Sequence, residues 1–248
     1  MTDRLTSKLP PTVAGVLLLA AVGLVGCGGV SSAKTASTSA HGTFSVQTAT
    51  LAAATTPAAQ VAQPVVIPGL RVTVPSSWPI NEDNPVNFDV SPPGRPNEVA
   101  FIWLNMRAVK SAGPGHGTTV LKSVGTTPSA LVRWLTTNPD FRVLASPARA
   151  SIGHVPMTTL VIGVSSTARY GDPHCPANPH CADVFTNPTY QHGDWFGIGG
   201  HEVVRMFLGH TSAGTVIVGL DANNPTALKH LETVGEPVID SIRFPHWA

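Results

Sequence analysis

The first 26 residues constrain this chain most, because they decide which part of it remains to form a core. Residues 1–11 carry Arg4 and Lys8, and residues 12–26 then run without a charge. A helix that spans a bilayer needs about 20 apolar residues, and the uncharged run is shorter. A short apolar run behind a basic start is typical of an export signal. We therefore expect residues 1–26 to be removed and the remainder to fold outside the cytoplasm.

The end of this run is Leu24-Val25-Gly26-Cys27: an aliphatic residue, a variable one, a small one and a cysteine. These four residues resemble the lipobox of bacterial lipoproteins, as found in actinobacteria. In that family the signal is cut immediately before the cysteine, whose thiol carries diacylglycerol. The resemblance implies that Cys27 becomes an acylated N-terminus, with palmitate-type chains that anchor the protein on the extracytoplasmic side of the cell membrane. The alternative is an ordinary secretory signal in which Cys27 has no role.

Residues 27–63 are dominated by Ala, Thr, Ser and Gly, with Phe44 as the one aromatic residue. Such a composition buries too little apolar surface to offset the entropy of the chain. We predict a flexible stalk over 27–63, and the alternative is a short helix around 49–62, where Ala is plentiful.

Residues 64–248 are expected to fold as one domain, long enough to bury roughly 70% of the surface that the unfolded chain exposes. Thr127 as a cap, Pro128 at the first helical position and an apolar face with Trp134 predict a helix over 127–138. Alternating or continuous apolar runs predict strands at 70–78, 98–106, 141–145, 148–153, 157–164, 202–209 and 213–222. The last two strands are separated by a short His-Thr-Ser turn, which predicts a hairpin.

The C-terminal segment opens with an Asn cap and Pro225, and its apolar residues recur near one helical face. Gly235 and Pro237 predict that it is divided into two helical pieces. Residues 168–201 are expected to be a turn-rich insertion. The expected fold class is α+β, a mostly antiparallel sheet packed by helices.

This layout resembles the Mog1/PsbP-like fold, an α/β/α sandwich seen in small exported lipoproteins. The matching features are the opening strand that ends in Pro-Ser-Ser-Trp (75–78), the middle helix, the late hairpin and the closing Ile-Asp-Ser-Ile-Arg-Phe (239–244). The resemblance implies a non-catalytic accessory or binding domain and transfers no catalytic residues.

The insertion carries two cysteines, Cys175 and Cys181, separated by five residues that include two prolines. With Cys27 acylated, these two remain as a pair in an oxidising compartment, which favours a Cys175–Cys181 disulfide. The prolines bend the short loop between them. Closing so small a loop contributes roughly 2 kcal/mol of stability in the chain-entropy model. Free or redox-active thiols are a further alternative.

Four histidines lie in or beside the same insertion: His174, His180, His192 and His201. Zinc binds imidazole and thiolate in tetrahedral sites, so these residues with the two cysteines are the candidate metal ligands. Structural zinc sites usually space paired cysteines by two to four residues, which disfavours that set here. The histidines alone remain an alternative metal site.

Other candidate sites are weaker. His-Glu-Val-Val-Arg (201–205) places Arg where a zinc protease needs its second His, and no nucleophile elbow is present. Trp195 and Phe196, in a segment flanked by glycines, are the candidate interaction surface, whereas Trp103 and Trp134 are expected in the core. Beyond residue 26 the basic and acidic residues balance at 13 each, so nothing favours a nucleic acid partner.

The sequence thus predicts a lipid-anchored envelope protein with a non-catalytic binding or accessory domain and no cofactor. Its expected partners are the membrane, through the lipid on Cys27, and an envelope ligand or protein that the sequence does not identify. One alternative is a His-dependent metal-binding protein or metalloenzyme. Another is a carrier for envelope lipids, which requires an apolar cavity between sheet and helix.

Overall fold

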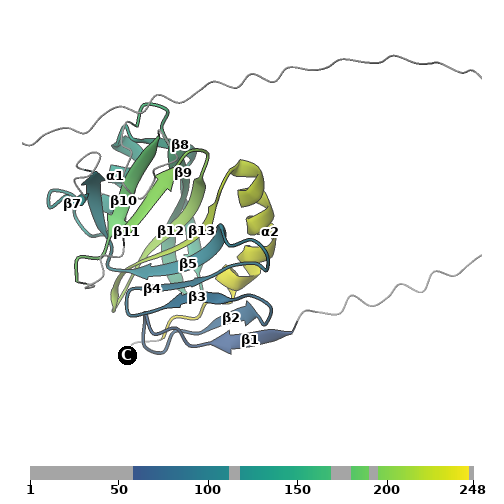
Figure 1. Ribbon diagram of the computed structural model, residues 1–248. Coiled ribbons are helices and arrows are strands. Elements are labelled where there is room, and N and C mark those ends of the chain that lie inside the picture. Colours follow the sequence, from purple (N-terminus) through teal and green to yellow (C-terminus); the bar gives the residue numbers. More distant parts are fainter. Residues whose placement is uncertain (1–57, 112–117, 169–179, 190–194, 246–248) are drawn as a thin grey trace, which may run out of the picture. The chain divides into compact units, whose positions relative to one another are not determined.

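A seven-stranded antiparallel sheet forms the centre of the fold, in the order β3-β4-β5-β13-β12-β9-β8 (Figure 1). The computed structural model describes residues 58–111, 118–168, 180–189 and 195–245. The sheet's strands are β3 (Ile80–Asp83), β4 (Asn87–Val90), β5 (Glu98–Leu104), β8 (Phe141–Ile152), β9 (Val155–Val164), β12 (Val203–Thr211) and β13 (Gly214–Ala222). The predicted strands at 141–145 and 148–153 are one strand, β8, which is interrupted by register shifts against β9.

A second, four-stranded sheet has the order β11-β10-β6-β7. Its strands are β6 (Arg107–Ser111), β7 (Thr118–Val120), β10 (Cys181–Thr186) and β11 (Trp195–Gly199). The expected turn-rich insertion at 168–201 therefore supplies two strands. All six residues of β10 are buried, so tertiary packing overrides the turn-rich composition that surrounds them.

The remaining strands, β1 (Ala59–Ala62) and β2 (Val72–Pro75), form a separate antiparallel ribbon. The predicted stalk at 27–63 is wrong at its end, because β1 pairs residue by residue with β2. The same pairing excludes a helix over 59–62. Residues 27–57 of that prediction lie outside the described residues.

The described residues contain two helices, one against each face of the large sheet. The longer helix, α2 (Pro225–Asp240), contacts β13, β5, β12 and β2, and it shares an apolar core with the β1–β2 ribbon. The shorter helix, α1 (Pro128–Thr137), contacts β8, β9 and β12 on the other face, which it shares with the four-stranded sheet. The α+β class is confirmed, but the outer layers are a helix with a ribbon and a helix with a second sheet, not helices alone.

Both helices begin as their sequences predict. Thr127 accepts a hydrogen bond from the backbone N–H of Ala130, and the Asn224 side chain accepts from two N–H groups in the first turn of α2. The predicted division of α2 at Pro237 is wrong. An internal proline removes one backbone hydrogen bond and its ring clashes with the preceding turn, which together cost roughly 3 kcal/mol. Val238 and Ile239 nevertheless remain buried beyond it and hold the last turn against the sheet.

The predicted hairpin is β12–β13, whose strands pair from Val203↔Ala222 to Thr211↔Gly214. Its turn is two residues long, so His210 and Thr211 belong to the strand. In the part of the chain that the structure describes, no helix has both the length and the apolar character that a membrane crossing requires.

Candidate functional site

The Pro-Ser-Ser-Trp segment that ends β2 forms a tight turn. The backbone N–H of Trp78 donates to the carbonyl of Pro75 at 2.9 Å, so the chain reverses and brings the indole back into the fold. Trp78 is 6% exposed and packs in the core below α2. The structure therefore puts this tryptophan inside the fold.

The outer face of the ribbon stands beside this turn. Val72 and Val74 point into the core, so Thr73 and Pro75 point the other way, as alternation along a strand requires. Ala59 pairs with Pro75 and Val61 pairs with Thr73, which puts both β1 side chains on that outer face. Val61 is 64% exposed, an unusual position for a large apolar side chain on a strand.

The last turns of α2 supply the opposite wall. Val234, Pro237, Val238 and Ser241 follow one another at intervals of three, one and three residues and therefore share one helical stripe. Ser241 is the C-cap of α2, and its side chain is hydrogen-bonded to the ribbon. Its hydroxyl accepts from the N–H of Thr73 at 2.8 Å and donates to the carbonyl of Val238 at 2.7 Å.

Between these walls lies a groove of about 550 Å³, with Trp78 in its lining. We call it the α2–ribbon groove; Ala59, Thr73, Pro75, Ser77 and Trp78 line one side, and the four residues of the α2 stripe line the other. Ligand pockets typically measure about 300–1,000 Å³ and are lined mainly by apolar side chains. Six of the nine lining residues are apolar and three carry hydroxyls. The lining therefore suits an apolar group with few polar contacts.

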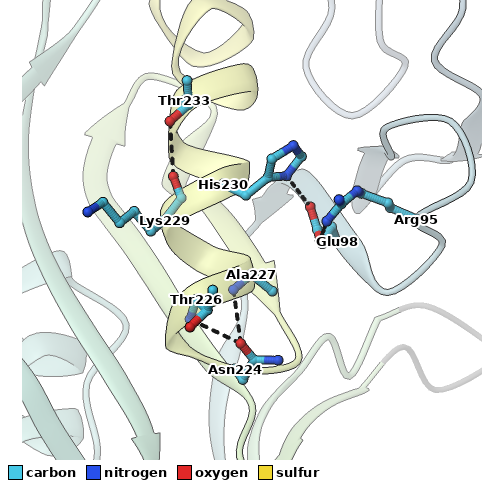
Figure 2. A network of polar contacts seen from close by, with 8 residues as sticks. All are labelled: Arg95, Glu98, Asn224, Thr226, Ala227, Lys229, His230 and Thr233. Atoms are coloured by element: carbon cyan, nitrogen blue, oxygen red, sulfur yellow. Dashed lines mark hydrogen bonds and ion pairs between the residues drawn. The ribbon is translucent and has the colours of Figure 1, made fainter. Parts of the chain in front are cut away.

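Two ionic contacts fix α2 over the large sheet. Figure 2 shows the first, in which Glu98 at the start of β5 accepts from Arg95 and lies 2.8 Å from Nδ1 of His230 on α2. The Glu98 side chain is only 7% exposed, so its two partners compensate the cost of burying a carboxylate. A histidine oriented by a buried carboxylate is a common arrangement in general bases. Among the described residues, however, no serine or cysteine side chain is hydrogen-bonded to His230.

The second contact is on β12, where Arg205 points toward α2. Its guanidinium pairs with Glu232 and Glu236, one turn apart on the helix, and lies 5.0 Å from the centre of the Phe207 ring. With His230, these pairs hold the middle of α2 in place. The C-terminal end is held differently, through Ser241 and the ribbon.

A pair of half-buried carboxyl groups lies on the opposite face of the sheet. Glu202 accepts from the N–H of Gly199 at 2.9 Å and shares a hydrogen bond with Asp221 of β13. Burial raises the pKa of Asp221 well above its usual value, and the neighbouring Glu202 carboxylate raises it further. Burial also raises the pKa of Glu202. The pair therefore retains a proton at a pH where an exposed carboxyl group has lost it.

Two of the four candidate histidine ligands are described, and they lie at one end of the β10–β11 pair. His180 precedes β10, and its carbonyl accepts from the N–H of Gly200, the residue before His201. The ring of His180 is used locally, with Nδ1 3.0 Å from the carbonyl of Ala168. His174 and His192 lie outside the described residues. Across the described ranges, no three His, Cys, Asp or Glu side chains form a metal-binding group.

The residues predicted to form the disulfide, the lipid anchor and the interaction surface are also only partly among the described residues. Cys181 opens β10 and is fully buried, but Cys175 and Cys27 lie outside the described residues, so the disulfide and the acylation stay predictions. Phe196 is half-buried, and its ring centre lies 4.5 Å from that of Trp103 in the core. This ring therefore contributes to internal packing. The side chain of Trp195 is outside the described set.

Comparison with known proteins adds little. A scan against models of protein families finds no match, and neither does a search of curated proteins. A search of solved structures matches the chain to the solution structure of cyanobacterial PsbP (CyanoP) from Synechocystis sp. PCC 6803. The two chains are 11% identical with a TM-score of 0.32, over 71% of this chain and 87% of that chain. This is a weak likeness of fold, and no statement about function rests on it.

Sequence reasoning missed the α2–ribbon groove because its walls are distant in the chain. One signal was present, the stripe formed by Val234, Pro237, Val238 and Ser241 beside the C-terminal end of a helix. The ribbon wall had no such signal, since β1 falls in a stretch whose composition resembles a linker. Only the pairing of β1 with β2 brings Ala59 to the groove.

Proposed function

We propose that this protein is a lipid-anchored, extracytoplasmic binding protein that holds an apolar chain in the α2–ribbon groove. The observation that carries the proposal is the groove itself, an apolar cavity between helix and ribbon that is large enough for a ligand. Such a cavity is also what the lipid-carrier alternative requires.

Binding without catalysis fits the chemistry of the lining. Catalysis by proton transfer needs a group that titrates within reach of the substrate, and the residues that line the groove include neither an acid nor a base. Of its three hydroxyls, that of Ser241 is already bonded to the backbone on both sides. The groove therefore offers shape and apolar contact, and burying apolar surface contributes about 25 cal/mol per Å².

The anchoring part of the proposal rests on Leu24-Val25-Gly26-Cys27. β1, which builds one wall of the groove, begins 32 residues after Cys27. Fully extended, a chain of that length spans at most about 110 Å. An anchor on Cys27 therefore keeps the groove near the membrane surface, where apolar chains are abundant.

Native mass spectrometry tests the binding claim. The experiment uses the full chain with Cys27→Ser, a substitution that removes the acylation site. We expect one bound molecule of monoolein or oleate per chain. Ala59→Trp fills the groove and should lower the affinity at least tenfold. Gln60→Trp is the matched control, because the neighbouring side chain on a strand points to the other face. A chain that binds neither probe would overturn the proposal.

Metabolic labelling with a palmitate analogue tests the anchoring claim. The wild-type chain should take up the label and Cys27→Ala should not. An unlabelled wild type, or a label that survives the substitution, contradicts acylation at Cys27.

The metal-binding alternative keeps one supporting observation, the backbone contact that puts His180 and His201 at the same end of the β10–β11 pair. Elemental analysis of the purified full chain decides it. A stoichiometric transition metal that is lost in His180→Ala but kept in the exposed His154→Ala would support a site there. A metal-free chain whose stability is insensitive to chelators would dismiss it.

A further inference from the structure

Two arginines lie side by side next to the α2–ribbon groove. Arg71, immediately before β2, and Arg243, after α2, form an antiparallel β-bridge. Two backbone hydrogen bonds make this bridge: the N–H of Arg71 donates to the carbonyl of Arg243 at 3.1 Å, and the N–H of Arg243 donates to that of Arg71 at 2.9 Å. Paired residues in such a bridge project their side chains to the same face.

That face is the one on which the groove opens. Along the β2 segment, Val72 and Val74 are buried while Arg71 and Thr73 are exposed, so the arginine and the groove-lining Thr73 share a side. On the other segment, Ile242 is buried and Arg243 is exposed. Successive residues on one face of a strand are about 6.6 Å apart. The arginine pair therefore lies one step along the two segments from Thr73 and Ser241, which line the groove and are hydrogen-bonded to each other.

Within the described part of the chain, only backbone carbonyls near the C-terminal end of α2 offset the charge of these two guanidinium groups, and they do so only in part. The Arg243 guanidinium donates to the backbone carbonyls of Asp240 and Ile242, at 2.6 and 2.9 Å. These contacts orient the group but leave its positive charge. Among the described residues, neither arginine forms an ion pair with a carboxylate, unlike Arg95 and Arg205. Two like charges held side by side repel each other, and an anion placed between them removes that cost.

We propose that Arg71 and Arg243 bind the anionic head of the ligand whose apolar chain occupies the groove, so that the ligand is an anionic lipid. This inference rests on the proposed function, because it takes the groove as the chain-binding site. Guanidinium groups match the geometry of carboxylate and phosphate oxygens and form two parallel hydrogen bonds with them. An uncharged groove beside a positively charged arginine pair complements a molecule that has an apolar chain and an anionic head.

Three probes with the same oleoyl chain and different heads test the inference: oleate, oleoyl-lysophosphatidylglycerol and monoolein. Each is titrated into the full chain carrying Cys27→Ser. We expect one or both anionic probes to bind about 5- to 10-fold more tightly than uncharged monoolein, as two partly exposed charge contacts provide. The ratio should shrink at high salt. Whether oleate or the phosphate probe binds more tightly identifies the head.

The decisive variant is Arg71→Gln with Arg243→Gln, which leaves the backbone bridge intact. It should bind all three probes with the affinity of monoolein, and its unchanged monoolein affinity shows that the groove is folded. Arg142→Gln with Arg149→Gln removes the same charge from exposed positions on β8 and should keep the preference.

The possible failures are distinct. Equal affinity of the wild type for all three probes, or a preference that survives the Arg71 and Arg243 substitutions, overturns the anionic-head inference and leaves the proposed function standing. Binding of none of the probes overturns the proposed function.

Discussion

The two faces of the seven-stranded sheet are built from alternate residues of the same strands, yet they are closed in different ways. Against the four-stranded sheet, Phe101 and Trp103 stack with ring centres 3.8 Å apart, and further rings pack around them. Against α2, the core is mostly aliphatic and ends at the α2–ribbon groove. We call these the aromatic face and the helix face.

The two faces differ in how completely the elements that pack on them cover their apolar side chains. On the aromatic face, Gly219 pairs with Phe101 across the strands, and a Cβ at Gly219 would lie 2.2 Å from the ring. This position must therefore remain glycine for the ring to pack against the sheet. On the helix face, Gly235 lets α2 approach Leu220 closely, but one stripe near the C-terminal end of the helix faces the narrow β1–β2 ribbon across the groove. A ribbon of two strands leaves uncovered apolar surface, and the groove lies there.

The largest expected effect is on the aromatic face. Trp103 is 7% exposed and contacts Phe101, Phe185 and Phe196. Trp103→Ala should lower the free energy of unfolding by about 3–5 kcal/mol, because it removes apolar contacts and leaves a cavity. Denaturant unfolding measures the change. Val61→Ala, on the exposed outer face of the β1–β2 ribbon, should change it by less than about 0.5 kcal/mol; a loss from Trp103→Ala that is no larger would contradict the packing of the aromatic face.

The predicted Cys175–Cys181 disulfide belongs to the aromatic face as well, because Cys181 begins β10. Cys175→Ser should destabilise the chain by about 2 kcal/mol under oxidising conditions, through the lost constraint on the unfolded state. Under reducing conditions the variant and the wild type should unfold alike. A difference that persists with reductant would show that the pair is not a disulfide.

On the helix face, His230→Ala removes one of the two partners of the buried Glu98 carboxylate. We expect a loss of about 1 kcal/mol, since Arg95 remains to compensate the charge. His201→Ala, in the exposed turn after β11, is the control and should have no measurable effect. If the two substitutions cost the same, His230 does not hold α2.

The smallest effect is a change in pH dependence, from the carboxyl pair on the aromatic face. Asp221 holds its proton more tightly in the folded than in the unfolded chain, because burial and Glu202 raise its pKa above the usual 3.8. This contribution to stability is complete below the usual pKa and is lost as the pH rises towards the raised value. Asp221→Asn still donates to Glu202 but has no carboxyl proton to lose, so its stability should fall less between mildly acidic and neutral pH.

Thermal unfolding over that pH range measures the effect, with the exposed Asp240→Asn as the control. Parallel profiles for Asp221→Asn and the wild type would show that the pair does not retain a proton.

Sequence patterns predicted the parts of the fold that depend on local signals. The cap at Thr127 and the pattern of apolar residues after it located α1, and alternating runs located β5, β9, β12 and β13. The errors arose where local and tertiary preferences conflict. Pro237 signals a helix end, but buried Val238 and Ile239 outweigh it.

The candidate site was harder to predict than the fold. The histidines and cysteines of 168–201 were the site residues predicted from the sequence, because these residue types bind metals and cysteine thiols are reactive. The α2–ribbon groove is lined by alanine, proline, valine, tryptophan and hydroxyl side chains, with no acid, base or thiol among them to signal a site. Its arginine pair depends on the bridge between positions 71 and 243, a contact 172 residues apart in sequence that no local pattern encodes.

The most direct test of the account is ¹⁹F NMR of the full chain carrying Cys27→Ser and labelled with 5-fluorotryptophan. The chain has five tryptophans, and Trp→Phe substitutions assign their signals. When oleate is added, we predict that the signal of Trp78 in the groove shifts and saturates at one equivalent, while those of Trp103 and Trp134 on the aromatic face stay in place. A Trp78 signal that does not move, or equal shifts of all three, would contradict binding in the groove.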